Sequence, residues 1–256
     1  MILRRIAEHL KQQHWTGVFI ELAIVVLGVF IGMQVSNWNE DRVSRASEVR
    51  HLQEISEDLR ADITVFDMIR KAALKRISAV DYVLGEKRGV SRPSALHMPA
   101  GETFDIPEGT PIQPADRNNL LAGTNLVRVT VGNRTGFEAL LGAGGMQTIR
   151  DRRISRQLQQ YYAQMDELVS LQNMVRQFRN DGTQIGYPLG LSAFGEMDAD
   201  KLIGIVRGSP AYSSYLRTAR EWAAIHLTSV EQQRQRAVTL LADINKYLGK
   251  GEDSAP

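Results

Sequence analysis

Residues 15–42 read WTGVFIELAIVVLGVFIGMQVSNWNEDR, and this stretch decides how the rest of the chain is interpreted. Between Gly17 and Val35 the only ionisable residue is Glu21, and nearly all the others are apolar. An α-helix of this length extends about 28 Å, which is close to the roughly 30 Å of hydrocarbon in a bilayer. The composition and length of the segment therefore predict a membrane-spanning helix.

The flanks of the apolar segment favour an anchor that is not cleaved. Trp15 and Trp38 stand at its two ends, and tryptophan settles at membrane–water interfaces. A secretory signal would need a shorter apolar core and a small-x-small cleavage site, and GMQVSNWNE offers no convincing one. A core helix of a soluble protein is rarely so apolar on every face. We therefore expect a transmembrane anchor over residues 15–38.

The orientation of the anchor depends on its flanking charges. Three basic residues lie close to each end, so a bare count of Lys and Arg is a tie. The first fourteen residues, MILRRIAEHLKQQH, have the pattern of a basic amphipathic helix, which suits an anionic cytoplasmic leaflet. The arginines after the span stand among acidic residues instead. We expect a single-pass inner-membrane protein with a cytoplasmic N-terminus and a periplasmic C-terminal domain.

Glu21, Gly28 and Gly32 fall on one stripe of the predicted span, at 100° per residue. The spacing Gly28-x-x-x-Gly32 allows two helix backbones to approach closely. A carboxylate inside the apolar boundary costs a few kcal/mol, less if it reaches the interface. Two interpretations are open. Either Glu21 reaches the headgroups and the glycines are ordinary for a span, or the stripe is a helix–helix contact.

The residues after the span predict a long amphipathic helix. Apolar residues recur every three or four positions from Leu52 to Leu84, with charged residues on the other faces. The glycines of LGEKRG mark the end of this pattern. We expect one helix over roughly residues 38–86, continuous with the anchor.

Further helices are predicted in the second half of the chain. Apolar spacing recurs through residues 137–178, and Asp198 is suited to cap a short helix. Ser209-Pro210 is a typical start for a last helix that ends near Leu248. The predicted fold class is therefore mostly α, a transmembrane helix continuous with an antiparallel helical bundle.

Residues 88–136 interrupt the helical pattern with prolines and glycines, and are predicted to be an insert. Within them TFDI and VRVTV alternate between polar and apolar residues, as two short paired strands would. A second glycine-rich stretch, residues 181–198, is predicted to be a loop. The expected organisation is a cytoplasmic segment at 1–14, the anchor at 15–38, a bundle at 39–248 and a disordered tail at 249–256.

The composition and motifs give no support for catalysis or for nucleic-acid binding. Basic and acidic residues nearly balance, at 31 against 29, and the absence of cysteine excludes disulfides and thiolate sites. No phosphate-binding or dinucleotide-binding glycine motif occurs. Glu48-x-x-His51 has the spacing of a metal pair but is predicted to lie on a solvated face, and His226 is predicted to lie in the core. We expect no cofactor, no metal and no nucleic-acid partner.

Four arginines are packed together at Arg150, Arg152, Arg153 and Arg156. Their guanidinium groups are able to hold a phosphate, a lipid headgroup or an acidic partner, which makes them a candidate anion site. No aromatic residues interleave with them, as binding to single-stranded nucleic acid would require. The alternative interpretation is the solvated start of a helix.

The stretch IELAIVVLGVFIGMQVSNWNEDR resembles the opening signature of a large family of uncharacterised bacterial membrane-anchored proteins, a domain of unknown function. The family pattern VVxGVxIGxQxxNWN is matched here at Gln34, Asn37, Trp38 and Asn39. A second block, FEALLGAGGMQTIRDRRISRQLQQYY, is similar to a looser recurrent block of the same family. The resemblance implies an inner-membrane anchor with a helical outer domain, and it implies no activity.

These observations predict a non-enzymatic membrane protein whose outer helical domain binds a protein or an envelope component. The expected partners are the lipid bilayer and either a second copy of the chain or another membrane protein. The alternative is a sensory module that binds a ligand beneath the loop at 181–198 and acts through a separate membrane partner. An enzyme of unrecognised type is the third and least favoured interpretation.

Overall fold

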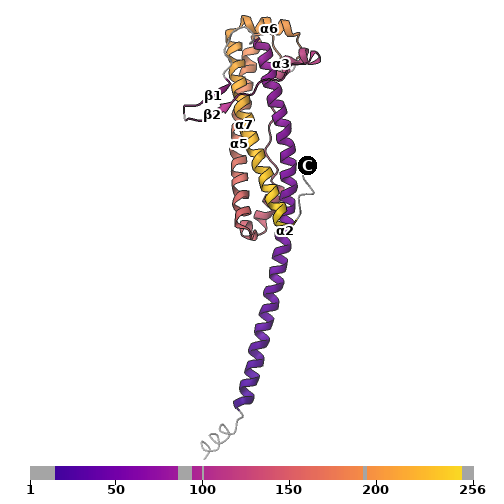
Figure 1. The fold of residues 1–256 in the computed structure, drawn as a ribbon, viewed down its shortest axis with the longest axis vertical. Helices are drawn as coiled ribbons and strands as arrows, with labels where there is room; N and C mark the ends of the chain where they lie inside the picture. The colour runs from indigo at the N-terminus through magenta and orange to yellow at the C-terminus, as the bar shows by residue number, and fades with distance from the viewer. Residues whose placement is uncertain (1–14, 86–93, 100, 193–194, 250–256) are drawn as a thin grey trace, which may run out of the picture. The chain divides into compact units, whose positions relative to one another are not determined.

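The computed structural model describes residues 15–85, 94–99, 101–192 and 195–249 of the 256-residue chain. The predicted amphipathic segment at 1–14 and nearly all of the predicted tail lie outside the described residues. The chain is mostly helical, as predicted, and divides into two compact units at residues 1–50 and 51–256. The elements carry the labels of Figure 1.

Helix α2, Trp15–Leu84, is a single helix of 70 residues that contributes residues 15–50 to the first unit and 51–84 to the second. It contains no proline, so no backbone donor is missing from its hydrogen-bond ladder. The helix ends where the glycine signal predicted. Gly85 has a φ of 61°, the left-handed conformation that commonly follows a helix C-terminus and that glycine adopts without strain.

Three long helices form the second unit: the 51–84 part of α2, α5 (Arg152–Gly186) and α7 (Pro210–Tyr247), which lie side by side (Figure 1). Helix α7 runs antiparallel to α2, because Asp67 pairs with Arg234 while the later Asp81 pairs with the earlier Arg220. It also runs antiparallel to α5. Helices α2 and α5 consequently run in the same direction, and the long connection between them returns along the bundle to make this possible.

Two apolar clusters fill the bundle along its length. The amphipathic stripe of α2 contributes to both, and each fully buried leucine or isoleucine stabilises the fold by about 1.5–3 kcal/mol. The first cluster joins the earlier part of α2 to the first turns of α5 and the last turns of α7, and includes Leu52, Ile55, Leu59, Phe66, Ile154, Leu158, Met165, Leu240 and Ile244. The second joins the end of α2 to α6 (Ala199–Gly208) and the start of α7, and includes Val80, Val83, Leu121, Leu202, Val206 and Leu216.

The helix starts follow local capping chemistry. Asp151 precedes α5, and its carboxylate accepts hydrogen bonds from the backbone N–H groups of Arg153 and Ile154. Asp198 caps α6 (Ala199–Gly208) in the same way, as its sequence position predicted. The predicted start at Ser209-Pro210 is also confirmed, since the Ser209 hydroxyl accepts from the N–H of Tyr212.

The insert between α2 and α5 contains only short elements in its described residues. A hairpin pairs β1 (Ala95–His97) with β2 (Thr103–Asp105), with Leu96 opposite Phe104. The prediction of a strand at TFDI is confirmed, but its predicted pairing with VRVTV is wrong. Residues 127–131 form no strand. The other elements are η1 (Pro114–Asn119), α3 (Leu120–Thr124), α4 (Thr135–Gly142) and η2 (Gly145–Thr148).

The glycine-rich stretch predicted as a loop at 181–198 is partly helical. Helix α5 continues to Gly186 and is followed by η3 (Tyr187–Leu189). Gly182 and Gly186 do not mark a turn. They leave room for the rings of Tyr215 and Tyr212, which pack directly against the backbone of α5.

Candidate functional site

The first unit presents a dense run of exposed apolar side chains on α2. Twelve large hydrophobic residues between Phe19 and Val35 are 57–72 % exposed, and Trp38 is 66 % exposed. This part of α2 is long and apolar enough to cross a membrane, and none of its apolar window is buried within the protein. A core helix of a soluble protein would bury such a window. For Trp15 and Glu21 the structure describes the helical backbone but not the side chains.

The glycine stripe of this segment is open in the single chain. A Cβ atom added to Gly28 or Gly32 would meet no other atom within 4 Å. The predicted helix–helix contact therefore has no partner within the described residues, and its surface is accessible to a second helix.

In the second unit residues 126–136, here termed the strap, lie against α2 and α5. Residues 126–134 form no regular element, and the last two residues begin α4. Its backbone N–H groups find acceptors on helix side chains. The N–H of Thr130 donates to Oε1 of the buried Gln172 at 2.7 Å, and the N–H of Gly136 donates to Asp58 at 2.8 Å. VRVTV, residues 127–131, lies within the strap. It forms no strand because side chains of the helices, and not the backbone of a neighbouring strand, accept its hydrogen bonds.

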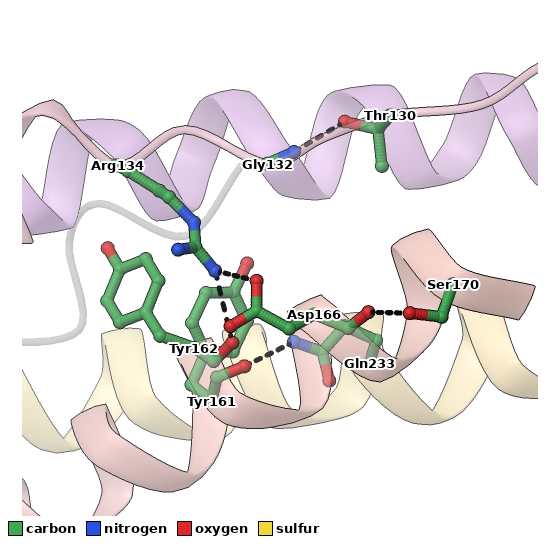
Figure 2. Close-up of polar contacts among 8 residues, drawn as sticks. All are labelled: Thr130, Gly132, Arg134, Tyr161, Tyr162, Asp166, Ser170 and Gln233. Carbon is green, nitrogen blue, oxygen red and sulfur yellow. Dashed lines mark hydrogen bonds and ion pairs between the residues drawn. The ribbon is translucent and has the colours of Figure 1, made fainter. Parts of the chain in front are cut away.

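Arg134 fastens the strap to α5 from the outside. Figure 2 shows its guanidinium group reaching both the backbone carbonyl of Tyr162 and the carboxylate of Asp166. Arg134 also lies 5.7 Å from the centre of the Tyr162 ring, within the range of a cation–π contact. Because this pair is largely exposed, it adds little stability on its own.

Asp62 joins the strap to both helices in the interior. It is 1 % exposed, and its Oδ1 accepts hydrogen bonds from the backbone N–H and the side-chain amide of Asn133, at 2.9 and 2.8 Å. Its Oδ2 accepts from the hydroxyl of Tyr161 at 2.7 Å. Burial raises the pKa of Asp62, and burial together with the neighbouring Asp62 raises the pKa of Tyr161 well above its usual range. The three donors make Asp62 a structural clamp.

A second polar cluster lies nearer the end of α2. Arg76 is 1 % exposed, and its Nε donates to the carbonyl of Thr124 at 3.0 Å. His226 is also buried, which confirms its predicted place in the core, and burial with the nearby Arg76 lowers its pKa to about 4. Among the described residues, neither Nη2 of Arg76 nor Nε2 of His226 has a hydrogen-bond partner. Burial keeps this imidazole neutral at pH 7.

The prediction that Glu48 and His51 lie on a solvated face is wrong. Glu48 is 0 % and His51 3 % exposed. Each has a partner on its own helix that reduces the cost of burial, Arg45 at 2.6 Å from Glu48 and Glu54 at 3.3 Å from His51. Within the described ranges no group of three or more potential metal ligands comes together.

Between α5 and α7 the surface of the second unit is hollowed by two adjoining cavities of about 210 Å³ each. Gln164 and Arg236 line both cavities, which makes them one continuous groove. Glutamine dominates its lining, with Gln157, Gln160, Gln164, Gln232, Gln233 and Gln235. This feature was missed in the sequence, where the signal is the spacing of three and four residues between the glutamines of α5.

The amide groups of this groove have unused hydrogen-bonding capacity. Within the described part of the chain, Oε1 of Gln157, Gln164 and Gln233 accepts no hydrogen bond, but these three atoms are buried, and the exposed amides of the lining are those of Gln160, Gln232 and Gln235. Gln233 is 1 % exposed, and its Nε2 donates to the backbone carbonyl of Tyr161 at 2.9 Å (Figure 2). Uncharged groups that both donate and accept suit a neutral polar ligand, such as a peptide backbone or a sugar.

The four clustered arginines lie at the start of α5. Arg150, Arg152, Arg153 and Arg156 are exposed, as the interpretation of a solvated helix start required. Nη2 of Arg153 lies 3.1 Å from Asp243 on α7, and its side chain remains 60 % exposed. Three of the guanidinium groups thus follow one another on the first turns of a helix, with Arg150 immediately before it.

Comparison with curated proteins and with solved structures found no match for the chain. A family model does match its N-terminal part, which contains most of the exposed apolar segment and the remainder of α2. Residues 21–88 are similar to the family of unknown function designated DUF6090.

Proposed function

We propose that this protein is a single-span membrane protein whose helical bundle is a non-enzymatic binding module. The observation that carries the proposal is the run of exposed apolar side chains from Phe19 to Val35, flanked by Trp38. Exposing so large an apolar surface to water is energetically unfavourable, whereas the hydrocarbon of a bilayer would cover it. The span lies in the inner membrane, with residues 1–14 in the cytoplasm and the bundle in the periplasm.

The glutamine-lined groove between α5 and α7 is the binding surface that the geometry favours. The neighbouring groove between α2 and α5 is already occupied by the strap, in which buried Gln172 accepts a backbone N–H. In the open groove the exposed amides of Gln160, Gln232 and Gln235 offer donors and acceptors of the same kind. The bundle therefore offers an external chain the kind of contact that it already makes with its own.

Topology reporters test the anchor and its orientation. One reporter active only outside the cytoplasm and one active only inside are fused in turn after Pro256, and membranes are extracted with carbonate. Activity of the outside reporter in carbonate-resistant membranes is expected. Activity of the inside reporter, or release of the chain by carbonate, would contradict the proposed arrangement.

Site-specific photo-crosslinking in cells tests the binding surface. A photoreactive amino acid replaces Gln160 in the groove or, as a matched control on the same helix, the exposed Met174. A defined crosslinked product from position 160 and none from position 174 is expected. Equal products from both positions would remove the groove from the proposal.

The same groove supports ligand sensing as a second function. Its cavities provide a recess for a neutral polar ligand. The measurement is the Tm of the protein during a screen of neutral sugars and short peptides. A sensing role predicts a compound that raises the Tm of the wild-type chain but not of a Gln164→Leu variant.

A further inference from the structure

We propose that the arginine patch formed by Arg150, Arg152, Arg153 and Arg156 is a second membrane contact, which binds anionic lipid headgroups. The inference rests on the proposed membrane anchor and adds a surface of the bundle to it. Its partner is the phosphate chemistry of an anionic phospholipid. Three observations lead to this assignment: the position of the patch within the second unit, the number of residues between the second unit and the span, and the lack of ion pairs at two of the arginines.

The patch lies at the end of the second unit where the chain enters from the anchor. Tyr161 of α5 is hydrogen-bonded to Asp62 of α2, and the two helices run in the same direction. Moving about ten residues back along both helices reaches Leu52 on α2 and Arg152 on α5. The ion pair of Arg153 with Asp243, near the end of the antiparallel α7, places the patch at the same end.

The chain tethers this end of the bundle near the bilayer. Fourteen residues lead from Trp38, at the boundary of the apolar segment, to Leu52. Even a fully extended chain of this length spans at most about 50 Å. The length of this connection therefore limits the distance between the patch and the headgroups, which raises the local concentration of the patch near them.

Two of the four cations of the patch are available for an external anion. In the part of the chain that the structure describes, Arg152 and Arg156 have no ion-pair partner, and both are exposed. Two carboxylates of this region, Asp151 and Asp243, are already engaged. Asp151 caps α5, and Asp243 accepts from Gln157 at 2.8 Å as well as facing Arg153. Guanidinium groups bind phosphate through paired, charge-assisted hydrogen bonds.

The chain is well suited to a direct test because it contains no cysteine. A single cysteine replaces exposed Gln159, one turn beyond the patch, or exposed Lys201 on α6 as a distant control, and carries a fluorophore. The full-length protein is placed in nanodiscs whose lipid headgroups carry a nitroxide quencher. The discs contain phosphatidylcholine alone or with phosphatidylglycerol.

We expect phosphatidylglycerol to increase quenching at position 159 but not at position 201. The double variant R152E/R156E should abolish that increase, and R176E/R207E, the same charge change on other exposed surfaces, should retain it. High ionic strength should weaken the increase. Two outcomes would overturn the inference and leave the anchor intact. In the first, phosphatidylglycerol does not change the quenching at position 159. In the second, the R152E/R156E variant shows the same increase as the wild-type chain. A chain that does not enter the discs at all would overturn the membrane anchor itself, and the inference with it.

Discussion

Tyr161 donates its hydroxyl hydrogen to Asp62 across 2.7 Å in the interior of the bundle, and so ties the first third of α5 to the part of α2 that belongs to the second unit. The same carboxylate holds the strap through Asn133. One buried acid therefore connects two parallel helices and the segment that joins them. This contact fixes the register between α2 and α5, which have no short turn between them to set it.

Removing the Tyr161 hydroxyl should destabilise the bundle. The Tyr161→Phe variant keeps the ring and its edge contact with Tyr162 but leaves Oδ2 of Asp62 without its donor. We expect a loss of about 1–3 kcal/mol in the free energy of unfolding, measured by urea titration. Tyr187→Phe, at a 62 % exposed tyrosine, is the control and should change the value by less than about 0.5 kcal/mol. Equal stability of the two variants would show that the clamp contributes nothing.

Gly182 should not tolerate a methyl group. A Cβ at this position would overlap the ring of Tyr215, which is buried and stacked on Phe178 with its centroid 5.2 Å away. Gly182→Ala should lower the free energy of unfolding by about 1–3 kcal/mol, because the ring must leave its packed position. Gly204→Ala tests the same change on α6, where a Cβ meets nothing within 4 Å, and should raise stability by up to about 1 kcal/mol. A Gly182→Ala variant as stable as Gly204→Ala would refute the close approach of α5 and α7.

His226 should make the protein less stable in mild acid. Its pKa is about 6.5 when unfolded and about 4 when folded, because burial, with a smaller effect of Arg76, disfavours the charged ring. The unfolded state therefore binds the proton more readily, so stability is full above pH 6.5 and falls as the pH drops towards 4. The expected loss between pH 7 and 5 is about 2 kcal/mol.

The check on this pH dependence is a variant without the imidazole. His226→Gln remains neutral at both pH values, so its loss of stability between pH 7 and 5 should be smaller than that of the wild-type chain by about 2 kcal/mol. Parallel pH curves for the two proteins would assign the acid sensitivity to other groups. Urea titrations of the full-length protein at the two pH values give both curves.

The parts of the fold that the sequence predicted are those that depend on near neighbours. The end of α2 before Gly85, the cap at Asp198 and the start of α7 after Ser209 each follow from residues a few positions apart. The apolar stripe of α2 likewise repeats at helical spacing. Short-range chemistry is sufficient for such features, and for the mostly helical fold class.

The parts that could not be predicted depend on residues far apart in the sequence. Gly182 signals either a turn or a close contact, and only the position of Tyr215 on another helix distinguishes the two. VRVTV has a strand pattern, but acceptors such as Gln172 on α5 replace a partner strand. Asp62 did carry a local signal, since it lies three residues after Leu59 and four before Phe66, on the apolar stripe. A charged residue in that position indicates a buried clamp.

The glycine stripe of the span should mediate self-association. Gly28 and Gly32 present an open surface on which a second helix backbone can approach closely, and Glu21 falls on the same stripe. Gly28→Leu fills this surface and should weaken association by on the order of tenfold, or about 1.4 kcal/mol, in a span-dimerisation reporter. Ala23→Leu adds similar bulk 140° away around the helix and should leave association unchanged. If Gly28→Leu and Ala23→Leu associate as well as the wild-type span, the glycines face lipid, and the module works as a monomer or through a different surface.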